Sequence, residues 1–320
     1  MRTQIFTFGQ YLQRKFGAKV SKVPVSISGF TCPNIDGTVA KGGCTFCEND
    51  SFSPSLDRVR PLKGFFLNLA STENPHLEQQ LQQLEWQFNA LSKKLHDEHG
   101  AQKFLVYFQS FTNTYAPLET LKALYEKALS FENVVGLSIG TRSDSITDET
   151  MAYLAELSKK TEIWVEFGIQ SIYDETLRRI NRGHDSANVK EAIRKAKSHG
   201  LNVCGHLIFG LPGETKEMML ETAKEAYELG IDSVKYHPLY VVKRTALANE
   251  YARGEFEPIS QELYIEVLCE ALLMKPEHVS VQRISAGIDD DTLIAPEWCR
   301  DKNTQFRAIN DALGKVGLKY

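Results

Sequence analysis

The sequence predicts an α/β fold, a partial (βα)6 TIM-like barrel with a C-terminal α/β extension. Three observations predict it. Short β-rich apolar runs alternate with amphipathic helical stretches, six such runs fill about residues 24–242, and no Gly/Ser- or Pro-rich linker separates the residues that follow. A parallel crossover needs a dozen or more residues and usually uses a helix, so the alternation favours parallel β/α units. Six units are fewer than the eight of a closed barrel.

The expected elements follow the chain in alternation. Strands are predicted at Pro24–Phe30, Lys103–Gln109, Val134–Gly140, Glu162–Gln170, Asn202–Gly210 and Ser233–Val242. Helices are predicted between them at Leu77–His96, Leu118–Phe131, Thr147–Lys159, Ala187–Gly200 and Glu214–Gly230, the last two ending on glycine as helices often do. Beyond Val242 we expect two helices, a strand-like piece at Val279–Ile284, an acidic turn at Asp289–Asp291 and a final helix. The predicted organisation is a basic N-terminal segment (1–23), a core (24–242) and an extension packed on it (243–320).

The composition excludes several classes of protein. With 320 residues, 42% hydrophobic and 24% charged, the chain can bury a sizeable core. Its net charge of −4 argues against coating nucleic acid by bulk charge. No run approaches the roughly 18–20 apolar residues that span a bilayer, so we expect a cytoplasmic protein with no membrane partner. Six cysteines are too few for a disulfide framework.

Three of these cysteines cluster in a loop after the first expected strand. Cys32 is followed by eleven residues, then Cys44, two more residues and Cys47. Neighbouring proline and glycines mark a loop in which the thiols can converge, which suits zinc or an iron–sulfur cluster. A structural zinc site is closed by four ligands, and the sequence has no second Cys-x-x-Cys or His pair. Three cysteines would instead leave one iron of a cubane cluster open; unligated cysteines are the ordinary alternative.

Several further motifs accompany this loop in order along nearly the whole chain. They are FTCPNIDGTVAKGGCTFC, YFQSFTNTYAP, GLSIGTRSDSI, EFGIQS, INRGHD, HLIFGLPGET, KYHPLYVVKRTALA and, in the tail, RISAG and LIAPEWC. In these motifs the sequence resembles the radical S-adenosylmethionine (SAM) enzymes. More closely, it resembles a bacterial family (the YhcC/YtqA type) whose radical domain is related to the elongator catalytic subunit. In that family a lengthened cysteine loop replaces the usual Cys-x3-Cys-x2-Cys.

The resemblance implies an enzyme that holds a [4Fe-4S] cluster and SAM. Cys32, Cys44 and Cys47 would bind three irons and SAM the fourth, while Phe46 holds the aromatic position that faces the cofactor. The implied reaction is one-electron cleavage of SAM to a deoxyadenosyl radical, with a reductant such as flavodoxin or ferredoxin.

Polar residues at strand ends are the next candidates for SAM. Gln109, Ser110 and Thr112 stand where many relatives carry Gly-Gly-Glu, so this chain departs from the family pattern there, and ordinary turn hydrogen bonds are the alternative. Glu166 and Gln170 lie four apart on one strand. They share a face if the strand alternates, and a carboxylate in an apolar strand needs a partner, such as a hydroxyl or ammonium group of SAM.

Arg142 follows the third strand and could pair with the SAM carboxylate, or else with Glu166 in an internal salt bridge. Gly210 would allow close approach of the backbone to adenine. Lys235, His237 and Tyr240 alternate with apolar residues and could point toward substrate or adenine; a satisfied core residue is the alternative for the histidine.

Two cationic stretches suggest a polyanionic substrate. The first 35 residues hold no acid but five cations, and 176–200 holds seven cations against two acids: Arg2, Arg14, Lys15, Lys19 and Lys22, then Arg178, Arg179, Arg182, Lys190, Arg194, Lys195 and Lys197. Solvated helix faces are the alternative. The resemblance adds tRNA, because family members are associated with the carboxymethylaminomethyl side chain of wobble uridine. Candidates for contact with phosphate or another anionic group are Arg178, Arg179, Arg182 and His184.

Three rival interpretations remain open at this point. One is a radical SAM oxidoreductase acting on a small molecule. Another is a zinc-containing nucleic-acid-binding module, with His206, His237 or Cys204 as a distant fourth ligand. The third is a hydrolase whose Gly-x-Ser-x-Gly motif centres on Ser138, although this serine lies inside an expected strand rather than at a sharp turn. No role is assigned to Cys204, Cys269 or Cys299; free buried cysteine is the common fate.

Overall fold

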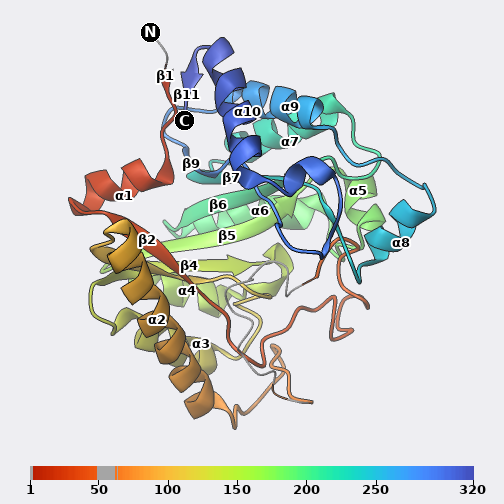
Figure 1. Cartoon of the computed structure of the whole chain (residues 1–320). Coiled ribbons are helices and arrows are strands. Elements are labelled where there is room, and N and C mark those ends of the chain that lie inside the picture. Colours follow the sequence, from red (N-terminus) through yellow and green to blue (C-terminus); the bar gives the residue numbers. More distant parts are fainter. Residues whose placement is uncertain (1–2, 49–61, 63) are drawn as a thin grey trace.

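A seven-stranded parallel sheet forms the centre of the computed structural model, which describes residues 3–48, 62 and 64–320 (Figure 1). Arg2, of the first cationic stretch, lies outside the described residues. In spatial order the strands are β2 (Val20–Val25), β3 (Lys103–Phe108), β4 (Val134–Thr141), β5 (Glu162–Gln170), β6 (Asn202–Phe209), β7 (Ser233–Pro238) and β9 (Ser280–Arg283). The sheet is open between β2 and β9. The predicted partial TIM-like barrel is therefore confirmed, with one more strand than expected.

Helices connect consecutive strands, as parallel pairing requires. They are α2 (Leu77–His99), α3 (Leu118–Leu129), α4 (Asp148–Ser158), α5 (Asp174–Arg179), α6 (Ser186–Ser198) and α7 (Lys216–Glu228). Apart from α5, whose Leu177 packs beside the cysteine loop, these helices pack their apolar faces on the outward residues of the strands in one large core, so β5 is buried on both faces. No helix in the described part of the chain is long and apolar enough to cross a membrane.

The first strand differs from its predicted range. It runs from Val20 to Val25 instead of 24–30, with Pro24 inside it. Proline is tolerated there because β2 is an edge of the sheet and needs no amide hydrogen on its free side. As a result Lys22, assigned above to a separate N-terminal segment, belongs to the barrel wall.

The tail beyond 242 contributes to the sheet rather than only packing on it. Its strand β9 pairs in parallel with β7, and β10 (Leu293–Ala295) pairs antiparallel with β8 (Val241–Val242), which is separated from β7. The other elements are α8 (Ala246–Ala252), α9 (Gln261–Met274), the 3-10 turn η4 (Glu297–Cys299), α10 (Lys302–Lys315) and β11 (Leu318–Lys319). The sixth predicted strand is thus split between the barrel and a small second sheet.

The N-terminal segment closes one end of the barrel. β1 (Thr3–Gln4) pairs with β11, so the two ends of the described chain lie side by side (Figure 1). Helix α1 (Phe8–Phe16) places Phe8 and Leu12 against residues from the amino-terminal halves of the strands, with Phe8 edge-on to Trp164 at 4.9 Å between ring centroids. Lys15 of this helix is 2.6 Å from Glu162. In the described part of the chain, α1 thus covers the amino-terminal end of the barrel and leaves the carboxyl ends of the strands uncovered.

Candidate active site

A cavity of about 200 Å³ lies at the carboxyl ends of the strands, where parallel α/β folds bind ligands. Side chains alternate along each strand, so every second residue faces the interior. Fourteen of the residues singled out from the sequence line this cavity: Cys32, Cys44, Phe46, Cys47, Gln109, Ser110, Thr112, Arg142, Glu166, Gln170, Arg182, Lys235, His237 and Tyr240. Candidates from widely separated segments therefore meet in one space.

The cysteine loop is held by the turn after α5. The Asn34 amide donates to the carbonyls of Asn181 at 2.6 Å and Arg182 at 2.9 Å, and the Asn181 amide donates to the carbonyl of Gly43 at 2.7 Å. Gly183 has a φ of 81°, and a Cβ there would lie 2.4 Å from Asn34 Oδ1. The turn therefore requires glycine at this position, and the motif INRGHD holds the cysteine loop in place through these hydrogen bonds.

Cationic and amide donors surround the sulfur of Cys44. Arg182 Nη1 and Asn34 Nδ2 each lie 3.6 Å from Cys44 Sγ, and Arg182 Nη2 donates to the Gly168 carbonyl at 2.9 Å. Arg182 is buried. It lies beneath the cysteine loop and lines the cavity, so its predicted contact with phosphate or another anionic group stays a prediction.

The three cysteine sulfurs fit a cluster better than a single zinc ion. Burial, followed by repulsion from the thiolates of Cys44 and Cys32, raises the pKa of Cys47, an effect that a bound cationic centre would reverse. In the described part of the chain, one group of three His, Cys, Asp or Glu residues has all its metal-binding atoms within 4.8 Å of one another, and it contains none of the loop cysteines. The three loop sulfurs are therefore not all within 4.8 Å of one another. Four sulfurs at 2.3 Å from zinc would stand only about 3.8 Å apart. A cubane, whose irons occupy separate corners, suits the wider spacing.

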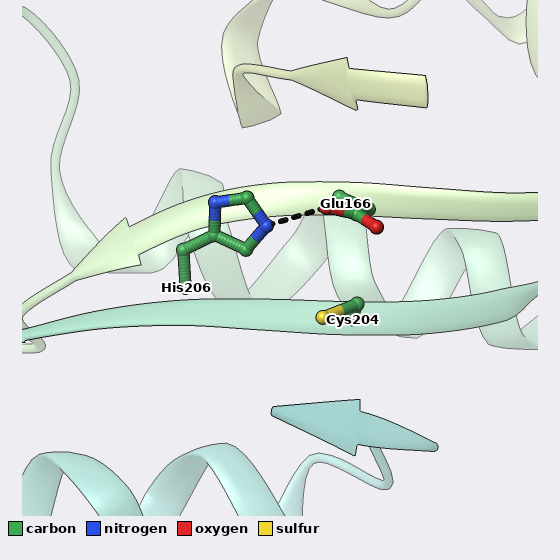
Figure 2. A group of neighbouring side chains, drawn as sticks. All are labelled: Glu166, Cys204 and His206. Carbon is green, nitrogen blue, oxygen red and sulfur yellow. Dashed lines mark hydrogen bonds and ion pairs between the residues drawn. The ribbon is translucent and has the colours of Figure 1, made fainter. Parts of the chain in front are cut away.

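The close trio is Glu166, Cys204 and His206 (Figure 2). His206 points from β6 toward Glu166 on β5, with Nε2 2.7 Å from Oε2. A metal ion is disfavoured here because the carboxylate already pairs with two lysines, and burial raises the pKa of Cys204 to about 12. Glu166, Cys204 and His206 therefore do not form a zinc site of their own.

Arg142 pairs with Asp144 rather than with Glu166. Its Nε and Nη2 atoms lie 2.8 Å and 2.6 Å from the two Asp144 oxygens, because Asp144 follows two residues later in the 3-10 turn η3 (Ser143–Ser145). The alternative Arg142–Glu166 salt bridge is not formed. Arg142 Nη1 is buried without a hydrogen-bond partner in a residue that lines the cavity. A carboxylate ligand such as that of SAM fits this orphaned donor.

Glu166 is the centre of a buried charge network. Lys22 and Lys235 both form ion pairs with it, Ser138 donates to it, and no part of its side chain is exposed. Burial would raise the pKa of Glu166, but the two ammonium groups outweigh burial and hold that pKa well below its usual value. Burial and the nearby lysine lower the pKa of His206 to about 4, so this histidine is neutral at physiological pH. The predicted contact of Glu166 with SAM stays a prediction, since the chain's own lysines satisfy the carboxylate.

Ser138 does not occupy a nucleophile elbow. It lies inside β4, fully buried, with its hydroxyl on Glu166. The hydrolase interpretation fails because an elbow must expose its serine at a strand-to-helix turn.

Four predicted site residues lie outside the cavity lining: Gly210, Arg178, Arg179 and His184. Gly210 has a φ of 92°, and a Cβ there would approach Ile259 Cβ to 2.6 Å, so the glycine serves packing of the tail. Arg179 pairs with Glu250 at 2.8 Å. Burial lowers the pKa of His184 to about 3, so it carries no charge for an anion.

The second cationic stretch is largely neutralised by the fold. On α6, Lys190 pairs with Glu225 at 2.5 Å, Lys197 pairs with Asp232 at 2.6 Å, and Lys195 pairs with Asp148. These pairs support the solvated-helix alternative for α6 rather than a phosphate-binding stripe.

Among the cavity residues that the sequence analysis did not assign to the site are Tyr107, Arg283 and Lys22. Tyr107 was detectable, because it lies two residues before Gln109 and so shares its face of β3. Arg283 and Lys22 could not be detected in this way, because the sequence analysis did not assign their strands to the barrel.

Glu214, just before α7, gives a pH prediction. Burial raises its pKa to about 7, although hydrogen bonds from Ser171 and Thr176 oppose the shift. A raised folded-state pKa stabilises the fold fully below about pH 4.5, and this contribution is lost as pH rises through 7. Relative to Glu214→Gln, the wild-type free energy of unfolding should fall by about 1–3 kcal/mol between pH 4.5 and 8, measured by urea titration. Exposed Glu175→Gln is the control; parallel wild-type and Glu214→Gln profiles would refute the assignment.

Comparison with known proteins gives two domain matches. Residues 37–226 match the radical SAM superfamily, and residues 231–315 match the radical SAM C-terminal domain. Together these matches cover most of the chain.

Relatives and solved structures agree with these matches. The uncharacterized protein YtqA of Bacillus subtilis is 37% identical over 311 residues, covering 97% of this chain and 90% of the relative. A tRNA uridine(34) acetyltransferase of Methanocaldococcus infernus is 34% identical over 163 residues, covering 50% of this chain and 30% of that protein. The structure of M. infernus Elp3 with an N-terminal deletion has a TM-score of 0.62 at 21% identity, covering 93% of this chain and 64% of that one. The Elp3 likeness shows the fold alone.

Proposed function

We propose that this chain, which belongs to the radical SAM superfamily and is a [4Fe-4S]- and SAM-dependent enzyme, modifies tRNA at the carboxymethylaminomethyl side chain of wobble uridine. The single observation that carries the chemistry is the meeting of Cys32, Cys44 and Cys47 with the orphaned Arg142 guanidinium in one cavity. Support for tRNA comes from the relative named for uridine 34 of tRNA, which shares half of this chain.

The residues of the cavity have separate roles in this proposal. Cys32, Cys44 and Cys47 hold the cluster, and Arg142 Nη1 receives the SAM carboxylate. When bound, the cluster and SAM supply one-electron chemistry that yields a deoxyadenosyl radical able to abstract hydrogen. Phe46 and Tyr240, both buried, form the apolar part of the wall and exclude water.

The polar end of β3 has a positioning role. Gln109, Ser110 and Thr112 line the same cavity as Arg142. They offer neutral acceptors for the SAM ammonium group where relatives use a carboxylate. Neutral acceptors attract the ammonium group less strongly than a carboxylate does. In this proposal Arg142 therefore makes the main contribution to orienting the amino acid part of SAM.

The test of this function uses anaerobically reconstituted protein, SAM, a reductant such as flavodoxin, and tRNA from a strain that lacks the gene. We expect deoxyadenosine release together with a change in mass of the wobble nucleoside. Deoxyadenosine release with an unaltered nucleoside would overturn the tRNA proposal and leave the radical chemistry intact, with a small molecule as the substrate. Absence of deoxyadenosine with every tRNA and every reductant would contradict the assigned roles of the cysteines.

A further inference from the structure

A second cavity adjoins the first at the open edge of the barrel. Lys22 and Pro24 of β2 line one side, and Gln282 and Arg283 of β9 line the other. The two cavities share the residues Tyr107, Gln109, Lys235 and Arg283. At the open edge of the sheet, the second cavity is therefore separated from the first by these shared side chains.

The wall shared by the two cavities has an excess of positive charge. Lys22, Lys235 and Arg283 face them, and Glu166 is the one carboxylate among the described lining residues. The Lys22 and Lys235 side chains are only 19% and 7% exposed, so water screens them little. Within the described residues the Arg283 guanidinium has neither an ion pair nor a hydrogen bond. Glu166 balances one of the three cations.

Hydrogen-bond donors are prominent along this wall. Lys22 uses its three hydrogens on Glu166, on Ser138 at 3.0 Å and on Gln282 Oε1 at 2.6 Å. Lys235 uses two, on Glu166 and on the Tyr107 hydroxyl at 3.0 Å, which leaves one. Gln282 Nε2 is buried without a partner. Buried donors are satisfied in nearly all proteins, so Gln282 Nε2 and the remaining Lys235 hydrogen suit a ligand rich in acceptors.

We propose that Arg283, Lys235 and the Gln282 amide form a subsite for a carboxylate group of the substrate. A planar carboxylate matches the guanidinium fork with two parallel hydrogen bonds, and its charge offsets the excess. Apolar and aromatic residues, Phe8, Tyr107, Val281 and Tyr320, line the rest of the side cavity and suit the short carbon stem of an organic acid. This inference rests on the proposed function for the identity of the molecule that bears the carboxylate, since a carboxymethylaminomethyl side chain ends in a carboxylate. The phosphates of tRNA would then stay outside the barrel.

The first test compares two anticodon stem-loops that differ only at wobble uridine, one with carboxymethylaminomethyl and one with methylaminomethyl. Their affinities for the cluster-loaded protein with SAM are measured by fluorescence anisotropy. Wild type should bind the carboxylate-bearing stem-loop about tenfold more tightly, and Arg283→Gln should bind both equally. Arg307→Gln, which removes an exposed cation from α10, should keep the preference, and Arg283→Lys should keep part of it. Equal weakening of both stem-loops by Arg283→Gln, or a wild type without preference, would overturn the subsite.

The second test is independent of tRNA. Acetate, acetamide and inorganic phosphate are added to the protein, and the midpoint of thermal unfolding is recorded. Acetate alone should raise the midpoint of wild type and Arg307→Gln, and should leave Arg283→Gln unchanged. Stabilisation by phosphate in place of acetate, or by acetate in Arg283→Gln, would contradict a carboxylate subsite. If acetate behaves as expected while neither stem-loop binds, the tRNA proposal fails and the subsite stands.

Discussion

Replacing Cys32, Cys44 or Cys47 with alanine is expected to reduce the release of deoxyadenosine from SAM to background. In the proposed site, the three thiolates would hold three irons of the [4Fe-4S] cluster and leave the fourth iron for SAM. Loss of one thiolate leaves a second iron without a protein ligand. Each variant should also lose most of the roughly four irons per chain that reconstituted wild type holds.

The measurement is anaerobic reconstitution, iron and sulfide analysis, and chromatography of deoxyadenosine after addition of SAM and reductant. Cys269→Ala is the matched control, because this buried cysteine lies on α9 and outside the cavity lining. It should keep iron content and deoxyadenosine release. Full activity in all three loop variants would show that the cysteine loop does not hold the cluster, whatever the second cavity binds.

The meeting of the three loop cysteines at one cavity was predictable because their spacing is local. Cys32, Cys44 and Cys47 lie on one glycine-containing loop, and no long-range pairing is needed to bring them together. The cofactor face of β3 and β5 was predictable for a related reason, since strand alternation fixes which side chains share a face. What the sequence did not contain was the support of the loop, because Asn34 meets Asn181 and Arg182 from a turn nearly 150 positions away.

The polar network was unpredictable for the same physical reason. Lys22 and Gln282, 260 positions apart, meet because β2 and β9 form the two edges of the open sheet. The first strand was predicted to begin at Pro24, beyond Lys22, and the strand-like piece at Val279–Ile284 was placed in the extension rather than in the barrel. The two cationic stretches overstated the positive charge available to a polyanion, because a sequence does not show which cations form salt bridges within the fold. Lys15 pairs with Glu162, and Lys197 pairs with Asp232.

Glu166→Gln is expected to destabilise the protein by about 3–5 kcal/mol, because it leaves two buried ammonium groups without their carboxylate. The lysines can recover only part of their solvation from water, since their side chains are only 19% and 7% exposed. Urea unfolding of metal-free protein at pH 7 gives the free energy. Asp97→Asn, which breaks the exposed pair with Lys93 on α2, is the control and should leave the urea midpoint unchanged.

The double variant Lys22→Met/Glu166→Gln separates charge burial from loss of shape. If the unpaired ammonium groups cause the destabilisation, removing one of them should recover part of the free energy of unfolding, so the effects of the two substitutions should not be additive.

The loss of stability in acid provides a second test. The depressed pKa of Glu166 contributes stability above its unfolded value, and this contribution is lost as pH falls, so wild type should lose more stability on acidification than Glu166→Gln. A Glu166→Gln protein as stable as Asp97→Asn, or additive losses in the double variant, would mean that the lysines are neutral in the fold. The wall would then lack the charge excess that a carboxylate requires.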